Sequence, residues 1–214
     1  MKHSDVEPEP AAAAQVLGAQ LETARDFAAR LAEVGEELGL IGPVERTRLW
    51  SRHILNCALV APYLRSGARV ADVGSGAGLP GLVLAIARPD VELVLIEPME
   101  RRTAWLLDES RRLELGNVTV LRARAEEAIE AGPFDQVTAR AVKALRQLIP
   151  MTRPLLEAGG EMLFLKGSRV EAEIEDSFKQ RRAARLGEPE VLILGEGVVP
   201  EPTRLFRATV VEAS

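Results

Sequence analysis

The chain has 214 residues, 47% hydrophobic and 28% charged, which predicts one substantial globular domain with room for a helical extension. No apolar run approaches the roughly 20 residues of a membrane helix, and the acidic, Pro-rich N-terminus lacks the pattern of a signal peptide. A net charge of −5 excludes nucleic-acid binding by overall charge alone, although arginine and lysine pairs form local basic patches.

The single cysteine, Cys57, excludes an internal disulfide and favours a reducing, cytoplasmic setting. With only two histidines beside it, the sequence offers no metal-binding cluster, so no metal is expected. The oligomeric state stays open, with a monomer favoured.

The N-terminal third of the chain predicts helices. Residues 1–14 are charged and Pro-rich and end in alanines, which is typical of a disordered tail. Apolar residues recur at helical spacing over 15–40, and a second helical pattern covers 45–64. We therefore expect a helical extension over 15–66, followed by a cofactor-binding domain over 67–214.

From residue 68 onward, short β-type runs alternate with helical patterns, which indicates βαβ units and a parallel sheet. The expected strands cover 69–73, 91–96, 118–121, 134–138 and 161–165. The expected helices cover 80–88, 100–115, 124–131, 142–157 and 170–186. Two last runs, 191–194 and 205–211, predict a closing antiparallel hairpin.

The most informative segment is Val-Ala-Asp-Val-Gly-Ser-Gly-Ala-Gly-Leu-Pro-Gly over residues 70–81. An apolar run ends in the carboxylate of Asp72, and the alternating glycines Gly74, Gly76 and Gly78 follow. The pattern predicts a strand, a bare loop and the start of a helix, so that a ligand can approach the backbone.

Charged residues follow five successive predicted strands. In an open parallel sheet, ligands bind beyond the carboxyl ends of the strands. An ion pair within the fold could explain any one of these charges, but five in succession indicate a site with an acidic and a basic half. The acidic half suits a cofactor with hydroxyl and ammonium groups, and the basic half suits a polyanion. The charges, in strand order, are Asp72, Glu97, Arg122 with Arg124, Arg140 and Lys166.

Two cofactors compete for this loop. Gly76, Gly78 and Gly81 satisfy the G-x-G-x-x-G pattern of dinucleotide-binding folds, which leaves a nicotinamide-dependent oxidoreductase as the alternative function. Asp72, however, would repel an incoming pyrophosphate. S-adenosylmethionine carries an ammonium and a sulfonium group and no phosphate, so the acidic strand end favours it.

The segment from Asp72 to Pro89 resembles the class I S-adenosylmethionine-dependent methyltransferases, and more narrowly the bacterial glucose-inhibited division protein B family. Further matches occur, in the family's order, at 52–56, 97–102, 124–126, 138–141 and 165–167. The resemblance implies a seven-stranded, mostly parallel sheet with helices on both faces. It also implies methylation of guanine N7 in small-subunit (16S) ribosomal RNA, free or within the assembled or assembling subunit.

The resemblance also implies roles for single residues. Asp72 and Glu97 would serve the amino group and the ribose of the cofactor, at the glycine loop formed by Gly74, Gly76 and Gly78. Further cofactor contacts would come from Leu79, Ala125, Glu126 and Arg140. The family's basic residues around the active site correspond to Arg124, Arg140 and Lys166.

Guanine N7 is a lone-pair nucleophile without a proton, so this reaction needs no general base. This agrees with a sequence in which His53 is the single candidate catalytic histidine, and packing or capping within a helix is the favoured explanation of that residue. Cys57 is expected in the N-terminal helices, away from the strand ends, as a small buried side chain. A non-catalytic RNA-binding assembly factor, and a methyltransferase for a small molecule or a protein, remain alternatives.

Overall fold

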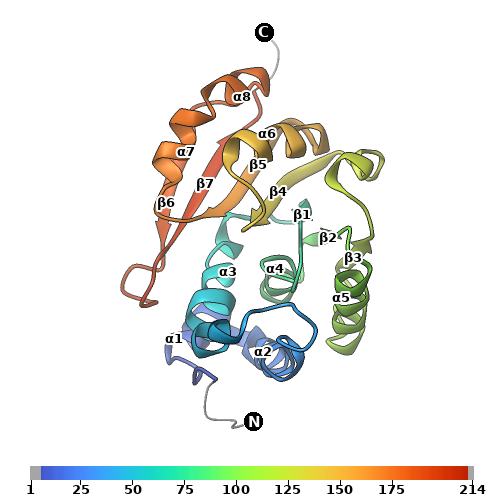
Figure 1. Ribbon diagram of the computed structural model, residues 1–214, viewed down its shortest axis with the longest axis vertical. Coiled ribbons are helices and arrows are strands. Elements are labelled where there is room, and N and C mark those ends of the chain that lie inside the picture. The colour runs from blue at the N-terminus through green and yellow to red at the C-terminus, as the bar shows by residue number, and fades with distance from the viewer. Residues whose placement is uncertain (1–5, 212–214) are drawn as a thin grey trace.

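A computed structural model describes residues 6–211, which form one seven-stranded sheet (Figure 1). The strand order is β3-β2-β1-β4-β5-β7-β6. Strands β1 to β5 are parallel, whereas β7 runs antiparallel to both β5 and β6, which confirms the predicted closing hairpin. The bounds are β1 Arg69–Val73, β2 Glu92–Ile96, β3 Val118–Leu121, β4 Phe134–Arg140, β5 Leu156–Lys166, β6 Glu190–Leu194 and β7 Thr203–Thr209.

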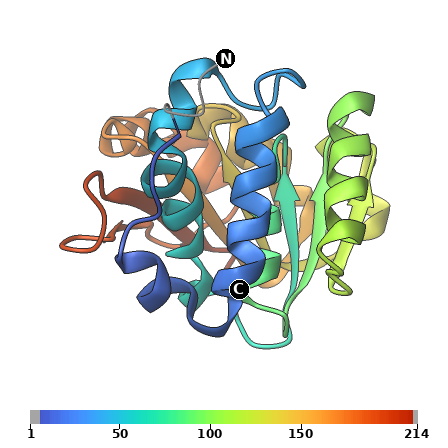
Figure 2. The ribbon, with the colours of Figure 1, turned by 90° about the horizontal axis from the view of Figure 1, so that it is seen from below.

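Helices cover both faces of the sheet, as expected (Figures 1 and 2). Alternate strand residues face opposite layers: Leu93 and Leu95 belong to one apolar cluster, and Val94 and Ile96 to the other. Both faces of the central strands are thus buried, which explains their nearly continuous apolar sequence. One layer holds α1 (Ala12–Leu17), α2 (Leu21–Val34), α3 (Asn56–Ala58), α4 (Gly81–Ala87) and α5 (Glu100–Arg112). The other holds α6 (Leu145–Thr152), α7 (Val170–Asp176) and α8 (Phe178–Ala183).

The N-terminal region is helical but less regular than its sequence predicts. Gly18, with φ of 52°, separates α1 from α2 inside the expected helix over 15–40. In place of one helix over 45–64, the chain forms a 3₁₀ turn (Pro43–Arg48), a π-helical segment (Leu49–Leu55), α3 and a second 3₁₀ turn. Six residues of the π-helical segment are buried. The 3.6-residue period of an α-helix does not predict which of its side chains face the core.

The disordered tail expected over 1–14 falls partly outside the described residues, which exclude 1–5. Over 6–14 the expectation is wrong, because this segment packs on the helices behind it. Ala13 is fully buried, and the carboxylate of Glu7 accepts a hydrogen bond from the backbone N–H of Ser51 at 2.9 Å. A division of the chain near residue 66 stays a prediction, and buried residues from both sides of it share one apolar cluster.

Three other expected helices differ from the structure. Two 3₁₀ turns replace the helix over 124–131, and Ser177 separates α7 from α8 within 170–186. The helix expected over 142–157 ends earlier because the chain enters β5 at Leu156, and the polar, Gly-containing start of that strand resembles a turn in sequence. Within residues 6–211, no helix combines the length and hydropathy needed to cross a membrane.

Candidate active site

The glycine loop connects β1 to α4 through backbone that few other residues could adopt. Gly74, Gly76 and Gly78 all have positive φ, between 55° and 90°. A Cβ atom on Gly78 would also lie 2.4 Å from a methyl group of Leu82. The loop therefore carries no bulky side chains at these positions, as the sequence predicts, and the N–H groups of Gly74 and Gly78 donate to the carbonyls of Ile96 and Ser75.

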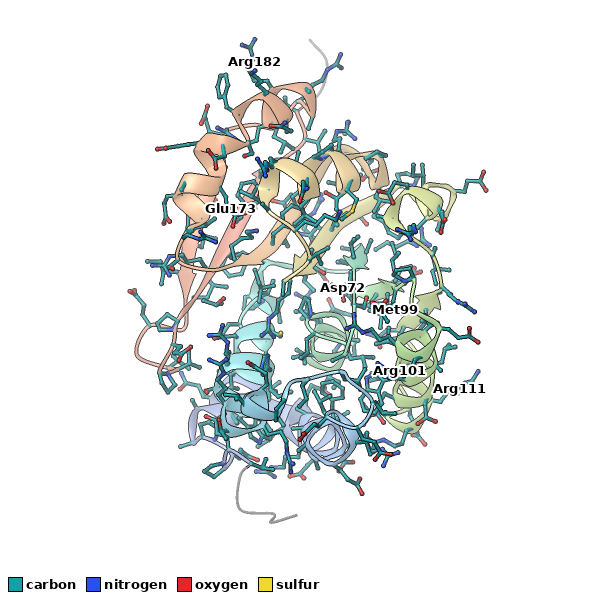
Figure 3. All side chains as sticks on the ribbon, viewed as in Figure 1. Asp72, Met99, Arg101, Arg111, Glu173 and Arg182 are labelled. Carbon is teal, nitrogen blue, oxygen red and sulfur yellow. The ribbon has the colours of Figure 1, made fainter. Side chains whose placement is uncertain are left out.

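Asp72 lies at the end of β1, behind this loop, near the middle of the molecule (Figure 3). Its side chain is fully buried and accepts hydrogen bonds from the N–H of Gly81 and the hydroxyl of Thr138, both at 3.1 Å. Burial raises the pKa of Asp72 to about 6, although the hydrogen bonds oppose the shift. Asp72 thus joins β1, β4 and the start of α4.

Glu97, directly after β2, is the second predicted carboxylate. One oxygen accepts a hydrogen bond from the N–H of Gly76 at 3.0 Å, and the other accepts from the N–H of Met99 at 2.9 Å. Each carboxylate oxygen has a second lone pair, so Glu97 retains acceptor capacity toward a ligand.

A cavity of about 340 Å³ opens beside Glu97, between the loops that follow β1, β2, β3 and β4. It brings together five of the predicted site residues, namely Gly74, Glu97, Arg124, Ala125 and Glu126. The rest of the wall includes the cations Arg102 and Lys143 and the apolar side chains of Val73, Ile96, Met99, Val142 and Met151. A carboxylate beside a group of apolar side chains fits the ribose and the base of an adenosine group.

Other predicted cofactor residues do not line this cavity. Asp72 is buried behind the loop, and Gly78 is buried within it. Gly76 donates its N–H to Glu97, and Leu79 packs partly buried against the apolar layer that contains α4. Arg140 lines a different cavity, described next.

The second cavity, of about 510 Å³, lies beyond the ends of β4 and β5. It contains Arg140 and Lys166, as predicted, together with Arg52, Asn56 and residues of the loop before β7. The Lys166 ammonium group lies 2.7 Å from the carboxylate of Glu173 on α7 and donates to the carbonyl of Lys143. Asn56 Oδ1 is buried and has no hydrogen-bond partner within the described part of the chain, so the cavity wall retains a free acceptor.

Ala141 lines both cavities and therefore joins them. Its φ of 55° is unusual for a residue with a side chain and costs about 1–3 kcal/mol, which the surrounding structure must offset. Such strain concentrates at functional sites. Of the charges predicted at the strand ends, Glu97 and Arg124 line the smaller cavity, and Arg140 and Lys166 line the larger one.

Arg140 is held by two residues of the N-terminal helical region. One guanidinium nitrogen donates to His53 Nδ1, and the other donates to Cys57 Sγ at 3.3 Å. The expectation that Cys57 lies away from the strand ends is wrong, because the π-helical segment and α3 pack directly over the end of β4. Burial raises the pKa of the Cys57 thiol, which keeps it protonated.

Arg122 and Arg124 differ from the other strand-end charges in that they are exposed. Arg122 pairs with the exposed Glu100 at 3.0 Å, and the backbone N–H of Arg124 donates to Glu127. Arg124 lies in the wall of the smaller cavity, whereas Arg122 does not.

Comparison with known proteins agrees with this geometry. Residues 20–194 match the family described as GidB, rRNA small subunit methyltransferase G. Ribosomal RNA small subunit methyltransferase G of Leifsonia xyli subsp. xyli is 60% identical over 205 residues, covering 96% of this chain and 98% of the relative. The protein of that name in Mycolicibacterium gilvum is 45% identical over 218 residues, covering 99% and 96%.

Solved structures support the fold alone, at low identity. A tRNA methyltransferase from Aquifex aeolicus aligns with a TM-score of 0.57 and 17% identity, covering 74% of this chain and 69% of its own. A SAM-dependent O-methyltransferase from Thermotoga maritima gives 0.58 and 18%, covering 74% and 66%. The fold is that of the class I methyltransferases, and the chain belongs to the rRNA small subunit methyltransferase G family.

Proposed function

We propose that this protein transfers a methyl group from S-adenosylmethionine to N7 of a guanosine in small-subunit ribosomal RNA. The observation that carries the proposal is that a carboxylate-edged cavity and a basic cavity adjoin at Ala141. The names of the relatives, which are small-subunit rRNA methyltransferases, support the same reaction class and the same RNA.

The smaller cavity is proposed to hold the cofactor. Glu97 would accept hydrogen bonds from the ribose hydroxyls, and Ala125 with Glu126 would border the adenine. The bare backbone at Gly74 would allow the cofactor to approach the sheet. Gly76 and Gly78 shape this loop, and Leu79 anchors it to the apolar layer. Asp72 would act by fixing β1 to α4 behind them.

The larger cavity is proposed to hold the RNA. Arg140 and Lys166 would contact a phosphate or the target guanine, since a guanidinium or an ammonium group binds phosphate and guanine acceptors. Arg124, exposed at the rim of the smaller cavity, would contact the RNA backbone. The target base must leave its stack to enter, because the major groove of A-form RNA is too deep and narrow for side chains to reach N7.

When bound, S-adenosylmethionine supplies an electrophilic methyl group on a sulfonium. The chain's own residues have to align the guanine with that group and exclude water, and guanine N7 needs no base to activate it. The neutral His53 ring and the protonated Cys57 thiol fit such a site, since neither has a nucleophilic or proton-accepting task here.

The alternatives from the sequence are less well supported. The family match does not favour a nicotinamide-dependent oxidoreductase. A non-catalytic assembly factor that keeps the cofactor pocket would share both cavities, and the transfer assay distinguishes it.

The test is transfer of labelled methyl groups from S-adenosylmethionine to purified small subunits and, separately, to naked small-subunit RNA. We expect 7-methylguanosine in the digested RNA of at least one substrate. Labelled RNA without 7-methylguanosine would refute the assigned atom. Cofactor binding without transfer to either substrate would favour the assembly factor.

A further inference from the structure

We propose that His53 is a positioning residue for methyl transfer: it fixes the Arg140 guanidinium from one side of its ring, while Glu45 fixes the ring from the other side. The inference rests on the proposed function, because it gives Arg140 a task at the RNA. It goes further by placing the control of Arg140 in the N-terminal helical region.

The geometry forms a continuous chain of contacts. Glu45, in the 3₁₀ turn, contacts His53 Nε2, and His53 Nδ1 contacts the Arg140 guanidinium at the end of β4. Glu45 is itself held by Arg48 through its other carboxylate oxygen. Three side chains thus connect the 3₁₀ turn before the π-helical segment to the wall of the larger cavity.

The donors in this chain define a single tautomer of His53. An arginine side chain has five N–H donors and no acceptor, so His53 Nδ1 must offer its lone pair to Arg140. The ring proton then lies on Nε2 and is donated to the Glu45 carboxylate. The ring is therefore neutral and asymmetric, with its acceptor toward the substrate cavity.

The surroundings favour that neutral ring. Burial and the nearby Arg140 charge lower the pKa of His53 to about 4, against the opposing effect of Glu45, and Arg52 adds to the lowering. A protonated ring would turn an N–H toward the guanidinium and break the contact. Near neutral pH, His53 remains an acceptor for Arg140.

His53 acts through Arg140 because it does not reach either cavity. The side chain of His53 is 9% exposed, and within residues 6–211 neither cavity lining includes it, whereas Arg140 lines the larger one. Together with Cys57, one helical turn further on, His53 accounts for two of the arginine's five donors. These contacts restrict the rotamers of the long Arg140 side chain. Without them, the guanidinium would be less well aligned with the RNA.

A double-mutant cycle tests the inference by comparing His53→Ala, Arg140→Ala and the double variant in methyl transfer to small subunits. We expect His53→Ala to lower kcat by about tenfold to a hundredfold, because a misplaced guanidinium costs alignment. Since His53 acts only through Arg140, the double variant should match Arg140→Ala within about twofold, and the Kd for S-adenosylmethionine should stay unchanged. Ser51→Ala, a buried change in the same π-helical segment without contact to Arg140, is the matched control and should retain the wild-type kcat.

Multiplying losses in the double variant would overturn the inference, and so would wild-type kcat in His53→Ala. If the wild-type protein transfers no methyl group to either RNA substrate, the proposed function fails instead. In that case, or if His53→Ala does not fold, nitrogen-15 NMR of the histidine rings in the wild-type protein tests the contact between His53 and Arg140. The variant His3→Gln identifies which signals belong to the other histidine. We expect a neutral ring protonated at Nε2 near pH 7, which shifts on Arg140→Ala; a proton at Nδ1 would overturn the inference.

Discussion

The two cavities hold their charged groups by different means. In the smaller cavity, which we propose for the cofactor, two backbone N–H groups hold the Glu97 carboxylate. One belongs to Gly76, 21 residues earlier in the chain, and the other to Met99, two residues later. In the larger cavity, which we propose for the RNA substrate, side chains 83 and 87 residues earlier in the chain hold the Arg140 guanidinium. The cofactor side is thus built by a local loop, and the substrate side depends on how the N-terminal helical region packs on the sheet.

This difference has a functional consequence. Backbone donors persist when a neighbouring side chain changes, so the cofactor cavity should tolerate substitution around Glu97. The substrate cavity should respond to changes in residues that touch no ligand. Substitutions can therefore separate cofactor binding from methyl transfer.

The largest effect is expected on the substrate side. Arg140→Ala and Lys166→Ala should each lower kcat for methyl transfer by about a hundredfold or more, because each removes a preorganised charge from the cavity proposed for the RNA. The Kd for S-adenosylmethionine, measured by calorimetry, should remain that of the wild type. Arg122→Ala removes an exposed strand-end charge outside both cavities and serves as the control; equal losses in all three variants would erase the distinction between the cavities.

The pH dependence of stability should separate Asp72 from His53. The folded-state pKa of Asp72 is raised to about 6. Its stabilising contribution to the free energy of unfolding is therefore present below pH 4 and is lost as pH rises toward 6. The pKa of His53 is lowered to about 4, so its contribution is present above pH 6.5 and is lost as pH falls toward 4. In the wild type the two effects oppose each other over the same pH range.

Substitution should reveal each effect, as measured by urea unfolding at several pH values. Relative to the wild type, Asp72→Asn should gain about 2–3 kcal/mol of unfolding free energy as pH rises from 4 to 6. His53→Ala should gain a similar amount, relative to the wild type, as pH falls from 6.5 to 4. Parallel curves for either variant and the wild type would contradict the assigned shift.

Gly81→Ala tests how tightly the cofactor side is packed. A Cβ atom there would lie 2.3 Å from Leu95 and 2.5 Å from Asp72 Oδ2, so the start of α4 would have to move. We expect a loss of about 1–3 kcal/mol in unfolding free energy. Gly116→Ala, where a Cβ atom meets nothing within 4 Å, is the matched control; an equal change in both would show that the loop is not tightly packed.

The smallest effect is expected for Glu97→Gln. The loss of a charged acceptor should weaken S-adenosylmethionine binding by about tenfold, or about 1.4 kcal/mol, while kcat at saturating cofactor stays close to the wild type. Glu92→Gln, at the exposed start of the same strand, should leave the affinity unchanged. A fall in kcat without weaker cofactor binding would contradict the assignment of Glu97 to cofactor binding.

The sheet and the cofactor loop could be predicted because their signals are local. Apolar runs of strand length mark the parallel strands, and the glycines after Asp72 mark a loop that requires positive φ. The bonds of Asp72 to Gly81 and Thr138 were not predictable, because Thr138 is 66 residues away. A strand-end carboxylate looks the same in sequence whether it faces a ligand or a helix start.

The contacts around Arg140 in the larger cavity could not be predicted from the sequence for a further reason. The segment over 49–55 is π-helical, so the 3.6-residue period assigns its faces incorrectly, and Cys57 was expected away from the sheet. His53, Cys57 and Arg140 come together through tertiary packing across more than 80 residues. The one available signal was the joint presence of 52–56 and 138–141 among the segments that resemble the family.

The central claim is that the two cavities are halves of one site, joined at Ala141. The most direct test is a crystal structure with S-adenosylhomocysteine bound, since this product lacks only the transferred methyl group. We predict that its ribose lies against Glu97 and its adenine beside Ala125, with the sulfur directed past Ala141 toward Arg140. A ligand outside this cavity, or a sulfur atom directed away from the basic cavity, would contradict the claim.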